Sequence, residues 1–181
     1  MSSRSKPANL EKKVLAIVKQ SGTSFYWALR FLPLKKREAM FAIYAFCREV
    51  DDIADGNGPL KEKSSQLKKW RQKVDNLYNN NPTDLITHAL TEPIKNYNLN
   101  KQDFIAIIDG METDSVDHLR IPNKAALAMY CDQVACSVGR LSNNIFGIEP
   151  ILGNKLAKFL GEALQLTNIL RDVYEDSDRN R

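Results

Sequence analysis

Prolines divide this chain into segments whose apolar residues recur at the spacing of an α-helix rather than in the alternation of a strand. The prolines that fall between such segments are Pro33, Pro59, Pro82, Pro93, Pro122 and Pro150. The predicted helices span residues 9–20, 24–31, 35–55, 60–78, 83–91, 101–117, 123–146 and 151–177. No apolar run closed by a hairpin turn indicates a strand. The sequence therefore predicts an all-α helical bundle.

Length and composition favour a single domain over residues 1–181. A chain of 181 residues is long enough to bury a substantial core. Hydrophobic residues make up 43% of it and charged residues 27%, which is an ordinary globular balance and argues against disorder. The sequence contains no internal repeat, no low-complexity linker and no evident domain boundary.

Charge and residue usage argue against several classes of function. The net charge is +4, and its basic residues are spread along the chain rather than clustered as a nucleic-acid-binding face requires. The two histidines stand alone and the three cysteines lack the spacing of a zinc site. We see no signal peptide and no apolar run approaching the roughly 20 residues of a membrane-spanning helix. A cytoplasmic protein without a nucleic-acid partner is expected.

The stretch "REVDDIADG" concentrates acidic residues directly after an apolar run. On the predicted helix, Tyr44, Arg48, Asp51 and Asp55 fall on one stripe about 60° wide. Carboxylates four residues apart repel each other, and facing a bundle interior they would be costly unless a cation joined them. Paired aspartates suit Mg²⁺, which often shares its shell with substrate phosphates, and an arginine offers a donor fork to phosphate oxygens. A solvated face near the end of an amphipathic helix is the alternative.

A second acidic cluster, "QLTNILRDVYED", repeats this pattern near the end of the chain. Gln165, Asn168, Asp172 and Asp176 fall on a stripe about 80° wide. Arg171 lies well round the helix from this stripe, although its long side chain can extend toward a phosphate. Two such helices facing each other would line a cavity that holds several Mg²⁺ ions and a diphosphate. A charged C-terminal tail is the alternative.

With these two clusters and two further stretches, the chain resembles the squalene and phytoene synthase family of head-to-head prenyl transferases. The stretches are "SGTSFYWALRFLP", "AIYAFCREVDDIAD", "YCDQVACSVGRL" and "LGEALQLTNILRDVYED". The resemblance runs from about Ser21 to the last residue and is strongest to the bacterial presqualene diphosphate synthases of hopanoid pathways. It implies an isoprenoid-synthase fold with a central cavity. The implied activity is the Mg²⁺-dependent condensation of two farnesyl diphosphates to presqualene diphosphate.

The resemblance also implies roles for individual residues. The metal-binding motifs match Asp51 and Asp55 in the first helix and Asn168, Asp172 and Asp176 in the second, the four aspartates being the catalytic residues. Positions that contact prenyl diphosphate match Ser21, Ser24, Tyr44, Arg48, Gln165 and Arg171. Mg²⁺ would make one diphosphate a better leaving group, and the two arginines would stabilise the developing charge. An apolar cavity would keep water from the allylic cation.

The chain departs from the family pattern at several positions. Gly22 stands where many relatives have serine, and Cys136 where many have glycine. Asp132 stands where carotenoid-type members often have tyrosine, which disfavours a carotenoid product. Family members continue with further helices beyond the position of Arg181, so we interpret the chain as the N-terminal part of the fold, truncated at its C-terminus.

Two alternatives to this function remain open from sequence. The nearer one is a phytoene or dehydrosqualene synthase, which shares the ionisation step and differs in chain length or product. The other is a non-catalytic scaffold or assembly protein with the same fold. Because prenyl tails are apolar, peripheral association with the inner face of the membrane is plausible, although no amphipathic anchor stands out. The oligomeric state is left open.

Overall fold

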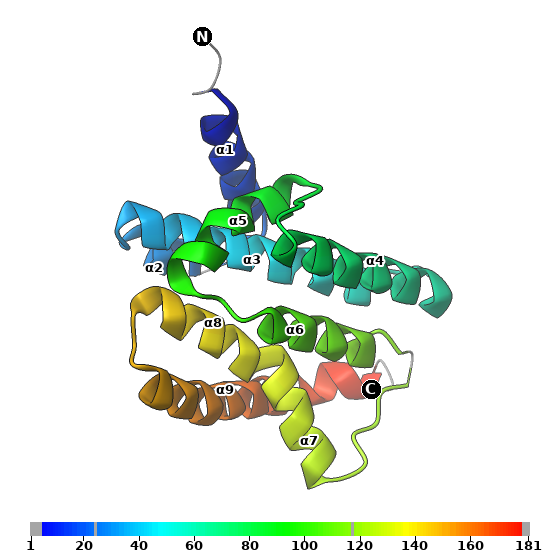
Figure 1. Ribbon diagram of the computed structural model, residues 1–181. Coiled ribbons are helices and arrows are strands. Elements are labelled where there is room, and N and C mark those ends of the chain that lie inside the picture. The colour runs from blue at the N-terminus through cyan, green and yellow to red at the C-terminus, as the bar shows by residue number, and fades with distance from the viewer. Residues whose placement is uncertain (1–4, 24, 117, 179–181) are drawn as a thin grey trace.

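The computed structural model describes residues 5–23, 25–116 and 118–178, with side chains from residue 10 onward. These residues form helices joined by turns and loops, and no strand occurs among them (Figure 1). The α-helices are α1 (Ser5–Gln20), α2 (Phe25–Arg30), α3 (Leu34–Asp55), α4 (Leu60–Tyr78), α5 (Leu85–Tyr97), α6 (Lys101–Asp114), α7 (Lys124–Cys131), α8 (Ser137–Phe146) and α9 (Pro150–Asp178), with a π-helix (Asp132–Cys136) between α7 and α8. No helix in this part of the chain is long and apolar enough to cross a membrane. The predicted all-α fold is confirmed.

The proline pattern is wrong in one place. α5 continues through Pro93, where the sequence pattern placed a boundary. The helix has a strong start, because Asp84 accepts a hydrogen bond from the Thr87 N–H and the Thr87 hydroxyl accepts one from the Asp84 N–H. A proline inside a helix removes one backbone hydrogen bond, but the ring of Pro93 is buried, and its burial offsets that loss. Pro150, also treated as a spacer, is the first residue of α9, a position that suits its fixed φ.

The predicted helix over residues 123–146 is three elements in the structure. The π-helix Asp132–Cys136 interrupts it, and the regular spacing of apolar residues gives no sign of this insertion. The π-helix lies against Gly161 of α9 at very close range. A Cβ atom added to that glycine would lie 2.8 Å from Cys136 Sγ and 2.9 Å from Cys136 Cα, so only glycine fits there.

The core centres on α3, which packs against α1, α2, α4, α5, α6 and α8. Its Phe46 is fully buried and meets Trp70 and Phe104 edge to face, with ring centroids 5.5 and 5.1 Å away. Burying a side chain of this size contributes about 2 kcal/mol, and aromatic pairs in this geometry add to it. The same helix therefore anchors the core on one side and carries the acidic stripe on another.

α9 packs on α8 and on the π-helix through small residues spaced by four, Gly153, Ala157 and Gly161. The amide of Asn143 on α8 donates a hydrogen bond of 2.7 Å to the Gly153 carbonyl. The rest of α9 is largely exposed, including Ile151, Leu152, Leu156, Phe159, Leu160, Leu164, Leu166, Leu170, Val173 and Tyr174. α9 therefore exposes a broad apolar face to solvent beside its acidic residues.

Candidate active site

The first acidic stripe lies on α3 as predicted. Tyr44, Arg48 and Asp51 are half-buried, and Asp55 is exposed near the end of the helix. One terminal nitrogen of Arg48 lies 3.3 Å from Asp51 Oδ2. The other forms an ion pair with Asp52, a residue that the sequence analysis did not assign to the site. The arginine therefore bridges two neighbouring carboxylates and leaves Asp55 without such a contact among the ion pairs of the described residues.

Burial raises the pKa of Asp51 above its ordinary value, and the charges of Asp55 and Asp52 raise it further, while Arg48 opposes them. The net direction shows that the negative charge on Asp51 is incompletely compensated in the folded chain. A cation placed between Asp51 and Asp55 would relieve both the repulsion and part of the cost of burial. The chemistry of this pair therefore fits a divalent metal ion.

The loop after α1 is joined to this stripe. The Tyr44 hydroxyl donates a hydrogen bond of 2.8 Å to Ser21 Oγ, and Ser21 in turn donates one of 2.8 Å to the Val18 carbonyl. Gly22 follows with a φ of +65°, a left-handed conformation that disfavours other residues and accounts for glycine at this position. The structure brings Ser21 and Tyr44 together, whereas Ser24, also assigned to this loop, lies outside the described residues.

The second acidic stripe lies on α9. Gln165, Asp172 and Asp176 are half-buried, and Asn168 is exposed. The Arg171 guanidinium folds onto its neighbour, with Nε and Nη2 each 2.6 Å from an oxygen of Asp172. This paired contact lowers the pKa of Asp172 and raises the pKa of Arg171. The sequence placed this arginine away from the stripe, and its long side chain closes the gap.

Both acidic helices pack against α8, and they run in the same direction, so their acidic ends lie on the same side of the molecule (Figure 1). Within the described residues, no three His, Cys, Asp or Glu side chains converge as a possible metal site. The two stripes are therefore separate pairs rather than one cluster. A carboxylate pair is nonetheless the usual protein share of an Mg²⁺ shell, because water and substrate phosphates complete it.

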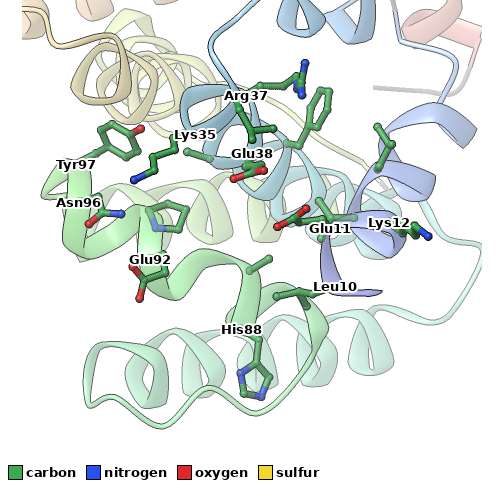
Figure 2. Close-up of a pocket in the computed structure, with 17 residues that line it drawn as sticks. Leu10, Glu11, Lys12, Lys35, Arg37, Glu38, His88, Glu92, Asn96 and Tyr97 are labelled. Atoms are coloured by element: carbon green, nitrogen blue, oxygen red, sulfur yellow. The ribbon is translucent and has the colours of Figure 1, made fainter. Parts of the chain in front are cut away.

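A hollow of about 430 Å³ lies elsewhere, between α1, α3 and α5 (Figure 2). Glu11 and Glu38 face each other across it, and burial together with the charge of Glu11 raises the pKa of Glu38. Charge does not select a ligand for this hollow, because its acidic and basic side chains balance: Glu11, Glu38 and Glu92 against Lys12, Lys35 and Arg37. No residue of either acidic stripe lines it.

One group of ion pairs was not predicted from the sequence. Arg140 on α8 contacts Asp103 of α6 at 2.6 Å and Asp132 of the π-helix at 2.7 Å. The Asp103 side chain is only 7% exposed, and its burial raises its pKa despite the contact with Arg140. From the sequence, Asp132 was considered only as a position that bears on the class of product. The only sequence signal for this group is an aspartate and an arginine eight residues apart, with Asp132 at the start of the π-helix and Arg140 in the following helix.

Comparison with known proteins identifies the class to which this fold and these acidic helices belong. The family model for squalene/phytoene synthase matches residues 18–181. The chain belongs to the squalene/phytoene synthase family, as the sequence motifs predict.

Several relatives are informative about the branch of the family. The chain is 48% identical over 160 residues to a presqualene diphosphate synthase of Rhodopseudomonas palustris, which covers 88% of this chain and 57% of the relative. A presqualene diphosphate synthase of Zymomonas mobilis is also 48% identical, with 88% and 55% of the two chains covered. Phytoene synthase 1 of Zea mays is 34% identical, with 91% and 42% covered. The chain thus spans little more than half the length of the bacterial relatives.

Solved structures agree with the fold. A dehydrosqualene synthase superposes with a TM-score of 0.85 at 31% identity, covering 96% of this chain and 60% of that one. The squalene synthase HpnC from Alicyclobacillus acidocaldarius superposes with a TM-score of 0.87 at 25% identity, covering 96% and 65%. The helical arrangement of Figure 1 is therefore that of the corresponding part of these enzymes.

Proposed function

We propose that the protein condenses two molecules of farnesyl diphosphate, with Mg²⁺, to presqualene diphosphate. The observation that carries this proposal is the pair of acidic stripes, Asp51 with Asp55 on α3 and Asp172 with Asp176 on α9. It is supported by 48% identity over 160 residues to presqualene diphosphate synthases. A scaffold protein has no need of a half-buried aspartate whose charge lacks a full counterpart.

The residues that would hold the metal ions are Asp51 and Asp55 on one helix and Asn168, Asp172 and Asp176 on the other. Bound Mg²⁺ withdraws charge from a diphosphate and makes it a better leaving group. The raised pKa of Asp51 is consistent with this role, because a carboxylate left under-compensated by the protein gains most from an added cation.

In this proposal, Arg48 and Arg171 would bind the diphosphate. Arg48 contacts Asp51 and Asp52, and Arg171 contacts Asp172. A bound diphosphate carries more negative charge than the carboxylates that each guanidinium now meets, so both would turn toward the ligand. There they would stabilise the negative charge that develops as the carbon–oxygen bond breaks.

The apolar part of the substrate would lie along α9. Leu164 and Leu166 flank the acidic stripe and are 55% and 40% exposed. Apolar side chains at this place suit a prenyl tail whose diphosphate is held at the aspartates. They would also keep water from the allylic cation. The double bond of a second prenyl chain would attack this cation, and loss of a proton from the resulting carbocation would close the cyclopropane ring.

The experiment is incubation of the protein with farnesyl diphosphate, with Mg²⁺ or with EDTA, followed by mass analysis of the products. We expect presqualene diphosphate only with Mg²⁺, and none from Asp51→Ala or Asp172→Ala. Phytoene from geranylgeranyl diphosphate would favour the carotenoid branch instead. A folded protein that binds no prenyl diphosphate and turns none over would favour a scaffold.

A further inference from the structure

One end of the molecule exposes a group of large apolar side chains that the proposed function does not use. They lie on α2 and directly after it, at the start of α3, at the end of α8 and at the start of α9: Trp27, Phe31, Leu34, Phe146, Ile151 and Leu152. We call this group the apolar edge. Phe31 is 88% exposed and Trp27 61% exposed, far more than large aromatic side chains usually are.

These segments lie together at one end of the fold, on the left in Figure 1. The Lys36 ammonium in the first turn of α3 donates a hydrogen bond of 3.0 Å to the carbonyl of Phe146, the last residue of α8. Arg37 donates one of 3.2 Å to the carbonyl of Arg30, the last residue of α2. The apolar edge is therefore one surface, joined by contacts between its own elements.

The exposure on α2 reflects the design of that helix. Leu29 is buried toward the core, whereas Trp27 of the same helix and Phe31, which directly follows the helix, are exposed. A surface helix normally has an apolar face toward the core and a polar face toward solvent. This segment departs from that pattern, because its solvent side also carries aromatic rings. Both rings therefore remain largely exposed, although Trp27 meets Tyr26 edge to face with ring centroids 5.2 Å apart.

One cation lies near the Trp27 ring, and others belong to the first turn of α3. The guanidinium of Arg30 lies 5.7 Å from the centre of the Trp27 ring, and Lys36 and Arg37 follow at the start of α3. The α8–α9 turn contributes one acid, Glu149, whose carboxylate accepts hydrogen bonds from the first N–H groups of α9 at 3.0 and 2.9 Å. The charge next to the apolar edge is therefore predominantly positive.

We propose that the apolar edge docks on the surface of an anionic phospholipid bilayer, with Trp27 and Phe31 entering the boundary between headgroups and acyl chains. Aromatic rings favour that depth, and arginine and lysine side chains at the same level meet the lipid phosphates. A second copy of this chain fits less well, because a symmetric contact would bring the cations of the two copies together. The inference goes beyond the proposed function and does not depend on the diphosphate site.

Intrinsic fluorescence provides a direct test, because the chain has two tryptophans and Trp70 is buried. The protein is mixed with vesicles of phosphatidylcholine alone or of three parts phosphatidylcholine to one part phosphatidylglycerol, then sedimented. We expect binding and a blue shift of Trp27 emission with the anionic vesicles, and weaker binding as salt rises. The double variant Trp27→Ser/Phe31→Ser should bind roughly tenfold or more weakly.

Matched variants distinguish membrane binding by the apolar edge from non-specific apolar binding and from effects on catalysis. Met129→Ser removes an exposed apolar side chain from α7 and should bind vesicles as the wild type does. Arg30→Gln should weaken binding to anionic vesicles but not to neutral ones. Asp51→Ala should bind vesicles normally even though the proposed function predicts loss of turnover. The inference is wrong if the double variant binds like the wild type, or if lipid-free dimerisation accounts for burial of Trp27.

Discussion

The Tyr44 hydroxyl on α3 donates a hydrogen bond of 2.8 Å to Ser21 Oγ in the loop that follows α1. This contact joins two residues that are 23 positions apart, both of which the family resemblance assigns to diphosphate binding. Because Tyr44 also lies on the acidic stripe, the loop is positioned by the same helix that carries Asp51 and Asp55. A side-chain hydrogen bond therefore connects the loop to the helix that carries the acidic stripe.

Tyr44→Phe removes this coupling without changing the shape of the ring. We expect a loss of about 1 kcal/mol in the free energy of unfolding, the usual value for one intramolecular hydrogen bond, and faster amide exchange at Ser21 and Gly22. Thermal unfolding and hydrogen exchange measure the two effects. Tyr174→Phe is the control, because that ring is 86% exposed, and it should change neither measurement.

Asp51→Asn is expected to stabilise the protein in the absence of metal. Since burial and the charges of Asp55 and Asp52 raise the folded pKa of Asp51, the folded state holds this proton more tightly than the unfolded state does. Its ionisation therefore costs stability as pH rises through that raised pKa. The variant should unfold at a higher temperature than the wild type at neutral pH, and the difference should shrink toward acid pH.

The same variant should lose any stabilisation by Mg²⁺. Asp52→Asn is the matched control, because Asp52 is more exposed than Asp51 and forms an ion pair with Arg48 beside the stripe. That control should keep the Mg²⁺ response. If Asp52→Asn abolishes the response and Asp51→Asn does not, the assignment of the stripe is wrong.

Much of this arrangement follows from the sequence, for definable physical reasons. Helical periodicity predicts α3 and α9, and a helix fixes which side chains share a face, so Asp51 and Asp55 lie on one stripe as expected. Periodicity says nothing about contacts between helices. The π-helix is invisible to it, and so is the position of Arg140 between Asp103 and Asp132.

Local rules also failed where tertiary contacts overrule them. Pro93 looks like a helix boundary by its chemistry, yet it lies inside α5 with its ring buried. The burial of a ring depends on neighbours that a residue spacing does not specify.

Gly161→Ala tests the close contact between α9 and the π-helix. The added methyl group would lie within 2.9 Å of backbone atoms of Cys136, so one of the two helices must move. We expect a loss of about 2 kcal/mol in the free energy of unfolding, or roughly 6 °C in Tm. Thermal denaturation followed by circular dichroism measures it. Gly58→Ala is the control, because its added methyl meets only a flexible Glu62 side chain at 3.6 Å, and a shift of similar size there would contradict the explanation.

Arg140→Leu tests the ion pairs that Arg140 forms with Asp103 and Asp132. It leaves the buried Asp103 without its cation, which should cost about 3 kcal/mol at neutral pH. Burial already raises the pKa of Asp103, and loss of the arginine raises it further, so the folded state binds this proton more tightly than the unfolded state. The loss should therefore shrink as pH falls, and denaturant unfolding across pH measures it. Adding Asp103→Asn to the variant should recover part of the stability, whereas a pH-independent loss would indicate a packing defect alone.

The central claim is that carboxylates of α3 and α9 together hold a diphosphate through divalent ions. Its most direct test is calorimetric titration with a non-reactive thio analogue of farnesyl diphosphate, in Mg²⁺ and in EDTA. The account predicts binding to the wild type in Mg²⁺ only, and loss of binding in Asp51→Ala and in Asp172→Ala alike. Equal binding in EDTA, or undiminished binding by either variant, would contradict it.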